Sequence, residues 1–366
     1  MGVGSSYLGN SQNAIKMNLD KKQLNENENE DKLIFEKKLA QFIPPKVKFK
    51  GNFSQRSLII KRDFSPRYIS NLTLFQNNIL ITIDSELQIY NKILKLIFSN
   101  KFGKNKDDIL SLNPINNETI SIACLYEVYI VNFYQRNNTI TYEIIQKIRD
   151  SNLYEVNKSL NNGYLILGGS DKKYSFYTKE KNNEQINSNN KYVMVNQISI
   201  GHYLDYEYYP VVIDLNNGRI LSNSSYDSNI KIIEYYPKQR IIKSIDDYML
   251  FNASLISGKY VLLMGLDYPK YYSWLMDTET FEFVKKWETP DDDLIECVLG
   301  ENLFLYSSSV RLAIDELNIE DGEFIRKTKY QFNLEKNEKF ETITFLNRNT
   351  FIAINSKTQL RIYYCK

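Results

Sequence analysis

Short runs of alternating apolar and polar residues fill most of the chain, from about Val47 to the last residues. The runs are separated by Asn, Asp, Ser and Gly, which favour turns. Because a strand points successive side chains to opposite faces, alternation with a period of two is typical of strands that bury one face. The pattern therefore predicts an all-β domain over residues 46–366.

The first 45 residues follow a different pattern. Most of them are polar, with too few apolar groups to offset the entropy lost on ordering, so we expect a disordered leader. Within 31–43, apolar residues recur every three or four positions until Pro44 interrupts them. Residues 1–45 are therefore interpreted as a polar leader that carries a short amphipathic helix at about 31–43.

A repeat emerges when one apolar position in the third strand of each predicted unit serves as a reference. Successive reference positions lie 41 to 46 residues apart, except for one interval of 56 that contains the polar segment 179–190, which we interpret as a surface loop. A β-propeller blade is a four-stranded antiparallel unit that repeats about every 40–45 residues, so the spacing predicts one propeller of seven blades. The reference positions are Tyr90, Phe133, Tyr177, Ile233, Trp274, Leu317 and Tyr363.

Turn residues support the repeat. An acidic residue stands six positions before the reference position in three units, as Asp84, Asp171 and Asp227. Asp is common in tight turns because its short polar side chain bonds the local backbone. We therefore place the hairpin between the second and third strands of these units at the acidic residue.

Two segments resemble parts of WD repeats. Residues 220–235 are similar to the second and third strands of such a repeat, and 350–365 are similar to a terminal one. The Gly-His pair that usually opens the repeat has one counterpart, Gly201-His202, and no Trp-Asp dipeptide occurs. The chain thus resembles degenerate WD-repeat seven-bladed β-propeller proteins, and the resemblance implies a scaffold that binds other proteins.

The last predicted blade is one strand short, because its third strand, at about 360–364, is followed by only two residues. The run 57–61 lies upstream of the first blade and belongs to none of the seven units. An unpaired last blade would leave sheet edges open. We therefore expect strand 57–61 to complete the seventh blade and to close the propeller.

Composition narrows the class of function. The 46 Lys and Arg nearly balance the 44 Asp and Glu, which argues against a nucleic-acid partner. Cys124, Cys297 and Cys365 are far apart and form no C-x-x-C motif, so neither a disulfide framework nor a cysteine zinc site is indicated. No apolar stretch reaches eighteen residues. We expect a cytoplasmic protein without a cofactor or metal.

Groups suited to catalysis are scarce. His202 is the one histidine, which we interpret as structural, and the nucleophile-elbow, P-loop and dinucleotide-binding motifs are absent. The acidic run 291–293 is interpreted as a solvated loop. We therefore predict that the protein is not an enzyme. The alternative is a propeller enzyme or small-ligand binder that uses acidic groups at the central channel.

A Tyr-rich stretch is the first choice for a partner surface, because Tyr offers a large contact area at low entropic cost. The predicted partner-binding residues are Tyr203, Asp205, Tyr206, Tyr208 and Tyr209. We expect other proteins as partners, with the chain as a monomer within a larger complex.

The chain begins MGVGSS, which matches the M-G-x-x-x-[ST] pattern for N-myristoylation at Gly2. One such acyl chain gives weak, reversible membrane binding, and neither a nearby Cys nor a dense basic cluster accompanies it. The pattern predicts a scaffold that is tethered reversibly to a membrane as a peripheral protein. If the match is fortuitous, a soluble scaffold remains.

Overall fold

The computed structural model describes residues between Phe53 and Cys365, all within the second of the two units into which the chain divides, Pro44–Lys366. The described ranges are 53–59, 69–76, 78–91, 93–103, 108–136, 139–149, 154–169, 171–180, 191–201, 210–224, 228–256, 259–267, 269–289, 294–298, 303–307, 312–320, 323–332, 340–347, 350–355 and 359–365. The predicted leader, with Gly2 and the helix at 31–43, lies outside them. Every regular element within these ranges is a strand.

The described strands form four-stranded antiparallel sheets, seven in number, and in six of them the four strands follow one another in the chain. The first sheet has β2 (Ile69–Phe75), β3 (Asn78–Ile83), β4 (Glu86–Tyr90) and β5 (Leu96–Lys101). The second has β6 (Ile109–Pro114), β7 (Thr119–Cys124), β8 (Glu127–Arg136) and β9 (Thr139–Arg149). The third has β10 (Tyr154–Ser159), β11 (Leu165–Gly169), β12 (Lys173–Lys179) and β13 (Tyr192–Ser199).

Three further sheets repeat this up-and-down order. The fourth has β14 (Val211–Asp214), β15 (Arg219–Ser224), β16 (Asn229–Glu234) and β17 (Arg240–Ile245). The fifth has β18 (Met249–Ile256), β19 (Tyr260–Asp267), β20 (Lys270–Asp277) and β21 (Phe283–Glu288). The sixth has β22 (Leu294–Val298), β23 (Leu303–Ser307), β24 (Leu312–Glu320) and β25 (Glu323–Phe332).

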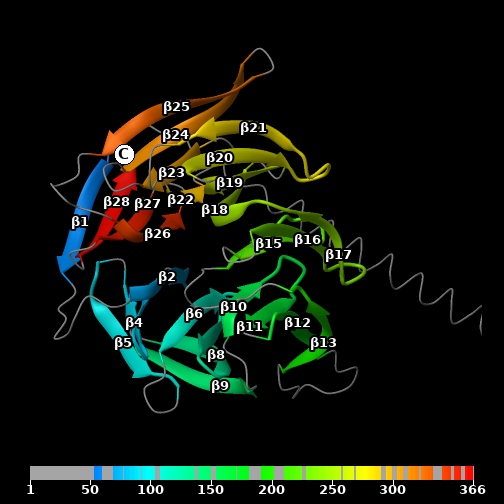
Figure 1. Cartoon of the computed structure of the whole chain (residues 1–366). Helices are drawn as coiled ribbons and strands as arrows, with labels where there is room; N and C mark the ends of the chain where they lie inside the picture. The colour runs from blue at the N-terminus through cyan, green and yellow to red at the C-terminus, as the bar shows by residue number, and fades with distance from the viewer. Residues whose placement is uncertain are drawn as a thin grey trace, which may run out of the picture. The chain divides into compact units, whose positions relative to one another are not determined.

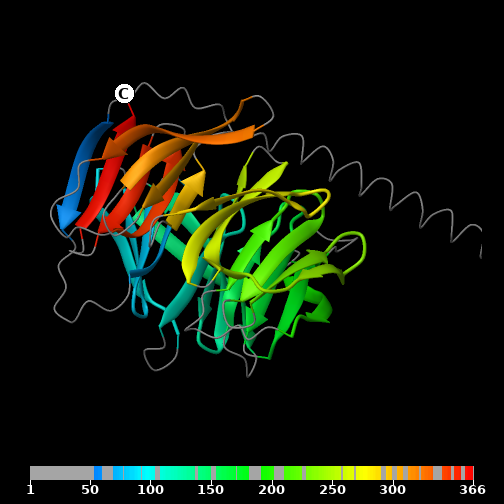
Figure 2. The same cartoon turned by 45° about the horizontal axis from the view of Figure 1, so that its top comes forward.

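The remaining sheet joins the two ends of the strand order. It contains β26 (Phe340–Asn347), β27 (Thr350–Asn355), β28 (Gln359–Cys365) and, beside β28, the first strand of the chain, β1 (Phe53–Ile59). The pairing of β1 with β28 is antiparallel and runs without a break from Phe53 opposite Cys365 to Ile59 opposite Gln359. Figures 1 and 2 show β1, in blue, alongside the red β28. The run that the sequence pattern places at 57–61 overlaps this strand.

The seven reference positions each lie on the third strand of their sheet: β4, β8, β12, β16, β20, β24 and β28. Asp84 and Asp171 lie in the hairpins that precede two of these strands, whereas Asp227 lies outside the described residues. The polar segment 179–190 connects β12 to β13, and its residues from 181 onward are likewise outside the description.

Successive sheets pack face against face. Their first strands contact one another in chain order, β2 with β6, β6 with β10, β14 with β18, β18 with β22, and β22 with β26, and β26 contacts β2 again. A shared apolar cluster, which includes Phe176 of β12 and Ile220 of β15, joins the third sheet to the fourth. The sheets therefore form a closed cycle, and Figure 1 shows first strands such as β2, β6, β10 and β18 on its inner side.

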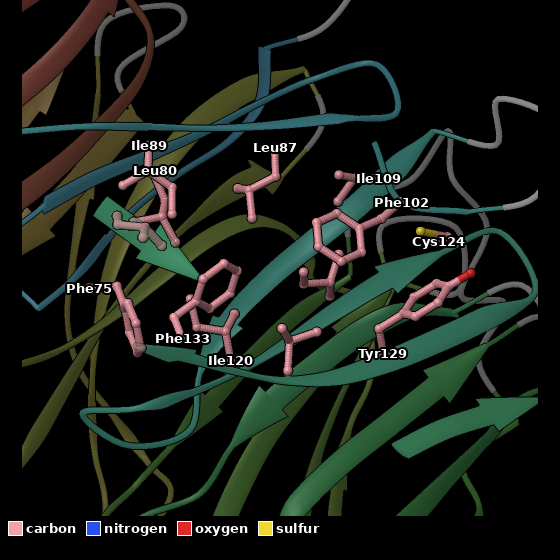
Figure 3. Packing of buried hydrophobic residues seen from close by; sticks show 13 residues of the cluster. Phe75, Leu80, Leu87, Ile89, Phe102, Ile109, Ile120, Cys124, Tyr129 and Phe133 are labelled. Atoms are coloured by element: carbon pink, nitrogen blue, oxygen red, sulfur yellow. The ribbon is translucent and has the colours of Figure 1, made fainter. Parts of the chain in front are cut away.

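The packing between the first two sheets shows what these faces bury. Phe75 at the end of β2 meets Phe133 of β8 edge to face, with ring centroids 5.9 Å apart. At the other end of the same cluster Phe102 packs against Tyr129, and the buried Cys124 belongs to the same cluster. Figure 3 shows this layer of side chains between the ribbons. Such burial of apolar surface is the main force that holds the sheets together.

A bulge recurs at corresponding places in the sheets. In each sheet from the first to the sixth, one residue of the fourth strand has no partner on the third strand. These residues are Ile97, Ile145, Val195, Ile242, Val284 and Lys329. Bulges bend an edge strand and increase its twist, which hinders pairing with foreign strands.

Candidate functional site

The partner loop predicted from the sequence lies outside the described residues, as does His202. Its place in the chain is nevertheless defined, because the description stops at Gly201, two residues after the end of β13, and resumes at Pro210, directly before β14. The predicted residues that fall in this interval are Tyr203, Asp205, Tyr206, Tyr208 and Tyr209.

The strand that leads into this loop, β13, has an exposed apolar run. It is the outermost strand of the third sheet, and three consecutive apolar residues on it are exposed: Val193 by 39%, Met194 by 56% and Val195 by 46%. Contiguous apolar surface on an edge strand promotes aggregation, and most proteins avoid it unless the surface binds a partner. We call Val193, Met194 and Val195 the β13 edge patch.

The bulge in β13 explains why neighbouring residues are exposed together. Met194 is opposite Tyr177 and Asn196 is opposite Phe176, so Val195 has no partner on β12. A bulge interrupts the strict alternation of faces. The apolar run therefore cannot hide every second side chain against the core, as a regular strand would.

At corresponding bulges of three other sheets the residue without a partner is covered. Ile97, Ile145 and Ile242 are only half exposed and pack against the apolar clusters between sheets. Val284 of β21 is exposed by 44%, but its neighbour Phe283 packs inward and Lys285 is charged. Among these described bulges, β13 alone carries a contiguous exposed apolar run.

Gln146 of β9 holds the start of β13 through two hydrogen bonds. Its side-chain nitrogen donates to the main-chain oxygen of Tyr192 at 2.8 Å, and its side-chain oxygen accepts from the main-chain N–H of Tyr192 at 2.7 Å. One amide thus pairs with both main-chain groups of an edge residue, as an added strand would. We call this pair the Gln146–Tyr192 clamp.

A second amide protects the edge beyond the bulge. The side-chain oxygen of Asn196 accepts from the main-chain N–H of Gln197 at 2.8 Å, and its nitrogen donates to the side chain of Gln239, directly before β17, at 3.1 Å. The β13 edge patch therefore lies between two positions at which side-chain amides already occupy the strand edge.

The Tyr192 side chain anchors the clamp in the core. It is 3% exposed and belongs to the apolar cluster between the second and third sheets, together with Ile148 and Leu165. Burial raises the pKa of its hydroxyl to about 12. The strand that bears the edge patch is consequently fixed from its inner side.

A different polar cluster lies between the first strands of the third and fourth sheets. The Lys158 ammonium group of β10 donates to the main-chain oxygen of Val212 at 2.5 Å. Burial lowers the pKa of Lys158, and the charge of Asp214 on β14 partly opposes this shift. The lysine thus ties two neighbouring sheets together.

Asp214 is enclosed by donors. Its carboxylate accepts from the main-chain N–H groups of Asn161 at 2.8 Å and Asn216 at 2.9 Å, and from the hydroxyl of Tyr235 at 3.0 Å. Burial raises the pKa of Asp214, and these hydrogen bonds and Lys158 lower it to a smaller extent. Because protein groups use its oxygens, this acidic residue of an inner strand serves the packing between sheets.

Other junctions use the same kind of linkage. Ser121 of β7 donates to the side chain of Asn157 on β10 at 2.6 Å, and Asn157 donates back to the Ser121 main chain at 3.2 Å. Asn223 of β15 donates to the main chain of Tyr248, directly before β18, and accepts from Leu250 of β18. Neither Asn was singled out by sequence reasoning, since a polar residue in an alternating strand ordinarily indicates a solvent-facing position.

The described ranges contain no group of three or more His, Cys, Asp or Glu side chains arranged to hold a metal ion. They also contain no helix that is long and apolar enough to cross a membrane. The acidic run 291–293 lies outside them.

The architecture can be compared with known proteins. No family model and no curated protein sequence matches the chain. The β-propeller domain of Cps50 (Swd1) from Myceliophteria thermophila is similar in structure, with a TM-score of 0.57 and 10% identity over 85% of this chain and 100% of that one. The WD40 domain of Pan2 from Neurospora crassa has a TM-score of 0.64 and 9% identity, over 88% and 98% of the two chains. The fold is that of a WD40 β-propeller.

This likeness confirms the WD-repeat resemblance drawn from the sequence, and with it the prediction of an all-β fold of four-stranded antiparallel sheets. At 9–10% identity the likeness concerns the fold alone. The site on this propeller that sequence reasoning missed is the β13 edge patch. Its one signal in the sequence is the unbroken run Val193-Met194-Val195, where strict alternation would have a polar residue.

Proposed function

We propose that the chain is a protein-interaction scaffold and not an enzyme, and that residues 53–365 form one seven-bladed propeller. The observation that carries this proposal is the β13 edge patch, an exposed apolar run on a strand fixed to a rigid sheet by the Gln146–Tyr192 clamp. Rigid sheets that present adaptable loops and edges suit the binding of other proteins.

The pairing of β1 with β28 supports the closed form of this propeller, because it gives the last sheet a fourth strand. Without β1, the edge of β28 would be unpaired and could pair with strands of other chains. A closed scaffold can hold partners at its rim without a change in its own fold.

The predicted Tyr-rich loop extends the proposed binding region. In the chain it follows β13 by two residues. We propose that Tyr203, Asp205, Tyr206, Tyr208 and Tyr209 act together with the β13 edge patch on the same partner. Aromatic side chains of this kind supply much of the binding energy of protein interfaces.

Lipidation at Gly2 completes the proposal. Its support is the N-terminal sequence pattern, and the expected result is a cytoplasmic scaffold that visits membranes reversibly. Intact-mass analysis of the protein from its native cell tests this part. A retained Met1, or a Gly2 that is unmodified or acetylated, excludes the membrane tether and leaves the scaffold proposal standing.

Crosslinking of the intact chain in its native cell, followed by mass spectrometry, tests the scaffold function. We expect defined partner proteins crosslinked to lysines near β13, such as Lys191. The matched comparison uses Val195→Lys and Val284→Lys, which place the same charge at corresponding bulges of two sheets. A chain without specific partners, or with a turnover activity that survives both substitutions, contradicts the proposal.

A further inference from the structure

The main-chain groups of β13 alternate between its neighbour β12 and the outer edge. Lys191 accepts from Glu180 at 2.9 Å, which directs the main chain of Lys191 toward the β12 side. Tyr192 and Met194, one and three residues further on, therefore direct theirs outward. The Gln146–Tyr192 clamp confirms this direction for Tyr192, because its amide reaches the edge from outside the sheet.

Ile200 fixes the direction beyond the bulge. Its N–H donates to Lys172 at 2.8 Å, on the β12 side, so the odd-numbered residues before it, such as Gln197, face outward. Asn196 occupies the outward N–H of Gln197. Within the described residues, side-chain amides thus bond the edge on both sides of Met194 and Val195, and no side chain bonds the main chain of these two.

We propose that this gap binds a short extended segment of a partner protein by strand addition. The segment pairs with the main chain at Met194 and packs apolar side chains on the β13 edge patch. This inference rests on the proposed scaffold function and names the partner chemistry at that site: an extended, uncharged stretch with apolar residues at alternate positions.

The side-chain amides of Gln146 and Asn196 favour a short segment over a second copy of the chain as the bound partner. A second copy of the chain that pairs through its own β13 needs several consecutive outward positions on both strands. Tyr192 and Gln197 are not available for it, because Gln146 and Asn196 already bond them. A single short segment needs only the gap between them. The same amides prevent a longer ladder, so the edge can expose apolar residues without inviting open-ended pairing.

The probe is a labelled peptide, acetyl-KTVTVTK-amide, together with the same peptide N-methylated at both Val residues, which removes main-chain donors and leaves the side chains in place. Binding to the full chain is followed by fluorescence anisotropy. Amide hydrogen exchange is measured for residues 192–197 with and without peptide. We expect saturable binding of the first peptide, slower exchange at Met194 and Val195, and binding about tenfold weaker after N-methylation.

Two substitutions complete the experiment. Val195→Lys adds a charge that deters strand addition, and we expect it to weaken binding about tenfold or more. Val284→Lys, at the corresponding exposed bulge of β21, should leave binding within about twofold, since that site lacks the apolar run. Both positions are exposed, and the melting temperature of each variant verifies that it folds.

Equal binding of the two peptides shows a purely apolar contact and overturns strand addition, as does unchanged binding by Val195→Lys. Concentration-dependent dimerisation that Val195→Lys abolishes also overturns it, in favour of a second copy. Should native partners still crosslink to Val195→Lys as they do to the unsubstituted chain, the scaffold function stands and the β13 gap is not its site.

Discussion

Gly265 of β19 lies so close to the main-chain oxygen of Met249 on β18 that a Cβ atom on Gly265 would collide with it. The two residues sit beside the bulge at which Phe251 is left without a partner on β19. Gly265 therefore permits the bend of the first strand in the fifth sheet.

Gly265→Ala should destabilise the domain by about 1–3 kcal/mol, because main chain cannot move aside as a flexible side chain can. Urea unfolding followed by circular dichroism measures this loss. Gly163→Ala is the control: nothing lies within 4 Å of a Cβ there, although the φ angle of +89° costs some strain. We expect a loss of about 1 kcal/mol or less for the control. Equal losses for both variants contradict the steric account.

Asn223 should be among the most sensitive polar positions. It is fully buried, donates to Asn229 at 2.8 Å and Tyr248 at 3.0 Å, and accepts from Leu250 at 3.1 Å. Asn223→Ala leaves these main-chain groups without their side-chain partner. Each group that water cannot reach should then cost about 1–3 kcal/mol of folding stability. Differential scanning calorimetry should show a lower melting temperature. Asn223→Ser with an unchanged melting temperature shows that water replaces the bridge.

The junction of Lys158 with Asp214 makes stability depend on pH through two buried groups. Burial raises the pKa of Asp214 in the folded chain, so the folded state holds this proton more strongly than the unfolded state. The protonated carboxyl favours folding below about pH 4, and that contribution is lost as pH rises through the folded pKa. Asp214→Asn should remove this decline.

Lys158 makes stability depend on pH below its ordinary pKa. Burial lowers its pKa, so the unfolded state binds more protons between the folded pKa and about pH 10.4. Stability should rise with pH across that interval, and Lys158→Met should abolish the rise. Urea midpoints measured from pH 3 to pH 10 report both effects. Profiles for the two variants that parallel the unsubstituted chain contradict these assignments.

Removal of β1 tests the closure of the sheet cycle. Deletion of residues 1–62 takes away the whole of β1 and leaves the edge of β28 open over seven residues, so we expect insoluble or unfolded protein. Deletion of residues 1–30 retains β1 and should leave the melting temperature unchanged. Size-exclusion chromatography and thermal melts distinguish the two. A longer deletion that melts like the full chain shows that closure contributes little.

The fold could be predicted because its information is local and periodic. Third strands such as Tyr174–Tyr177 within β12 are buried between neighbouring sheets, so they carry apolar residues at a fixed interval. Turn residues such as Asp84 mark the hairpins between them. The start of the closing strand was less accurate: the strand begins at Phe53, four residues before the run at 57–61 that the sequence pattern indicates.

The candidate site could not be read in the same way. Gln146 pairs with the main chain of Tyr192, 46 residues later, and a main-chain partner leaves no trace in the sequence. Val195 is exposed because β13 bulges there, and a bulge is decided by pairing with β12. Gly2 and the Tyr-rich loop at 202–209 lie outside the described residues, so the predictions for them stand as predictions.

The pairing of β1 with β28 also sets the order of events during synthesis. Of the described strands, β1 leaves the ribosome first and β28 follows all the others, about 300 residues later. At about 5–20 residues per second, roughly 15 to 60 s separate the two. During that time β1 has no native partner, while the intervening sheets can each form from consecutive strands. The final sheet thus assembles only after β28 has been made, and the nascent chain must keep its first strand unpaired, or held by a chaperone, until then.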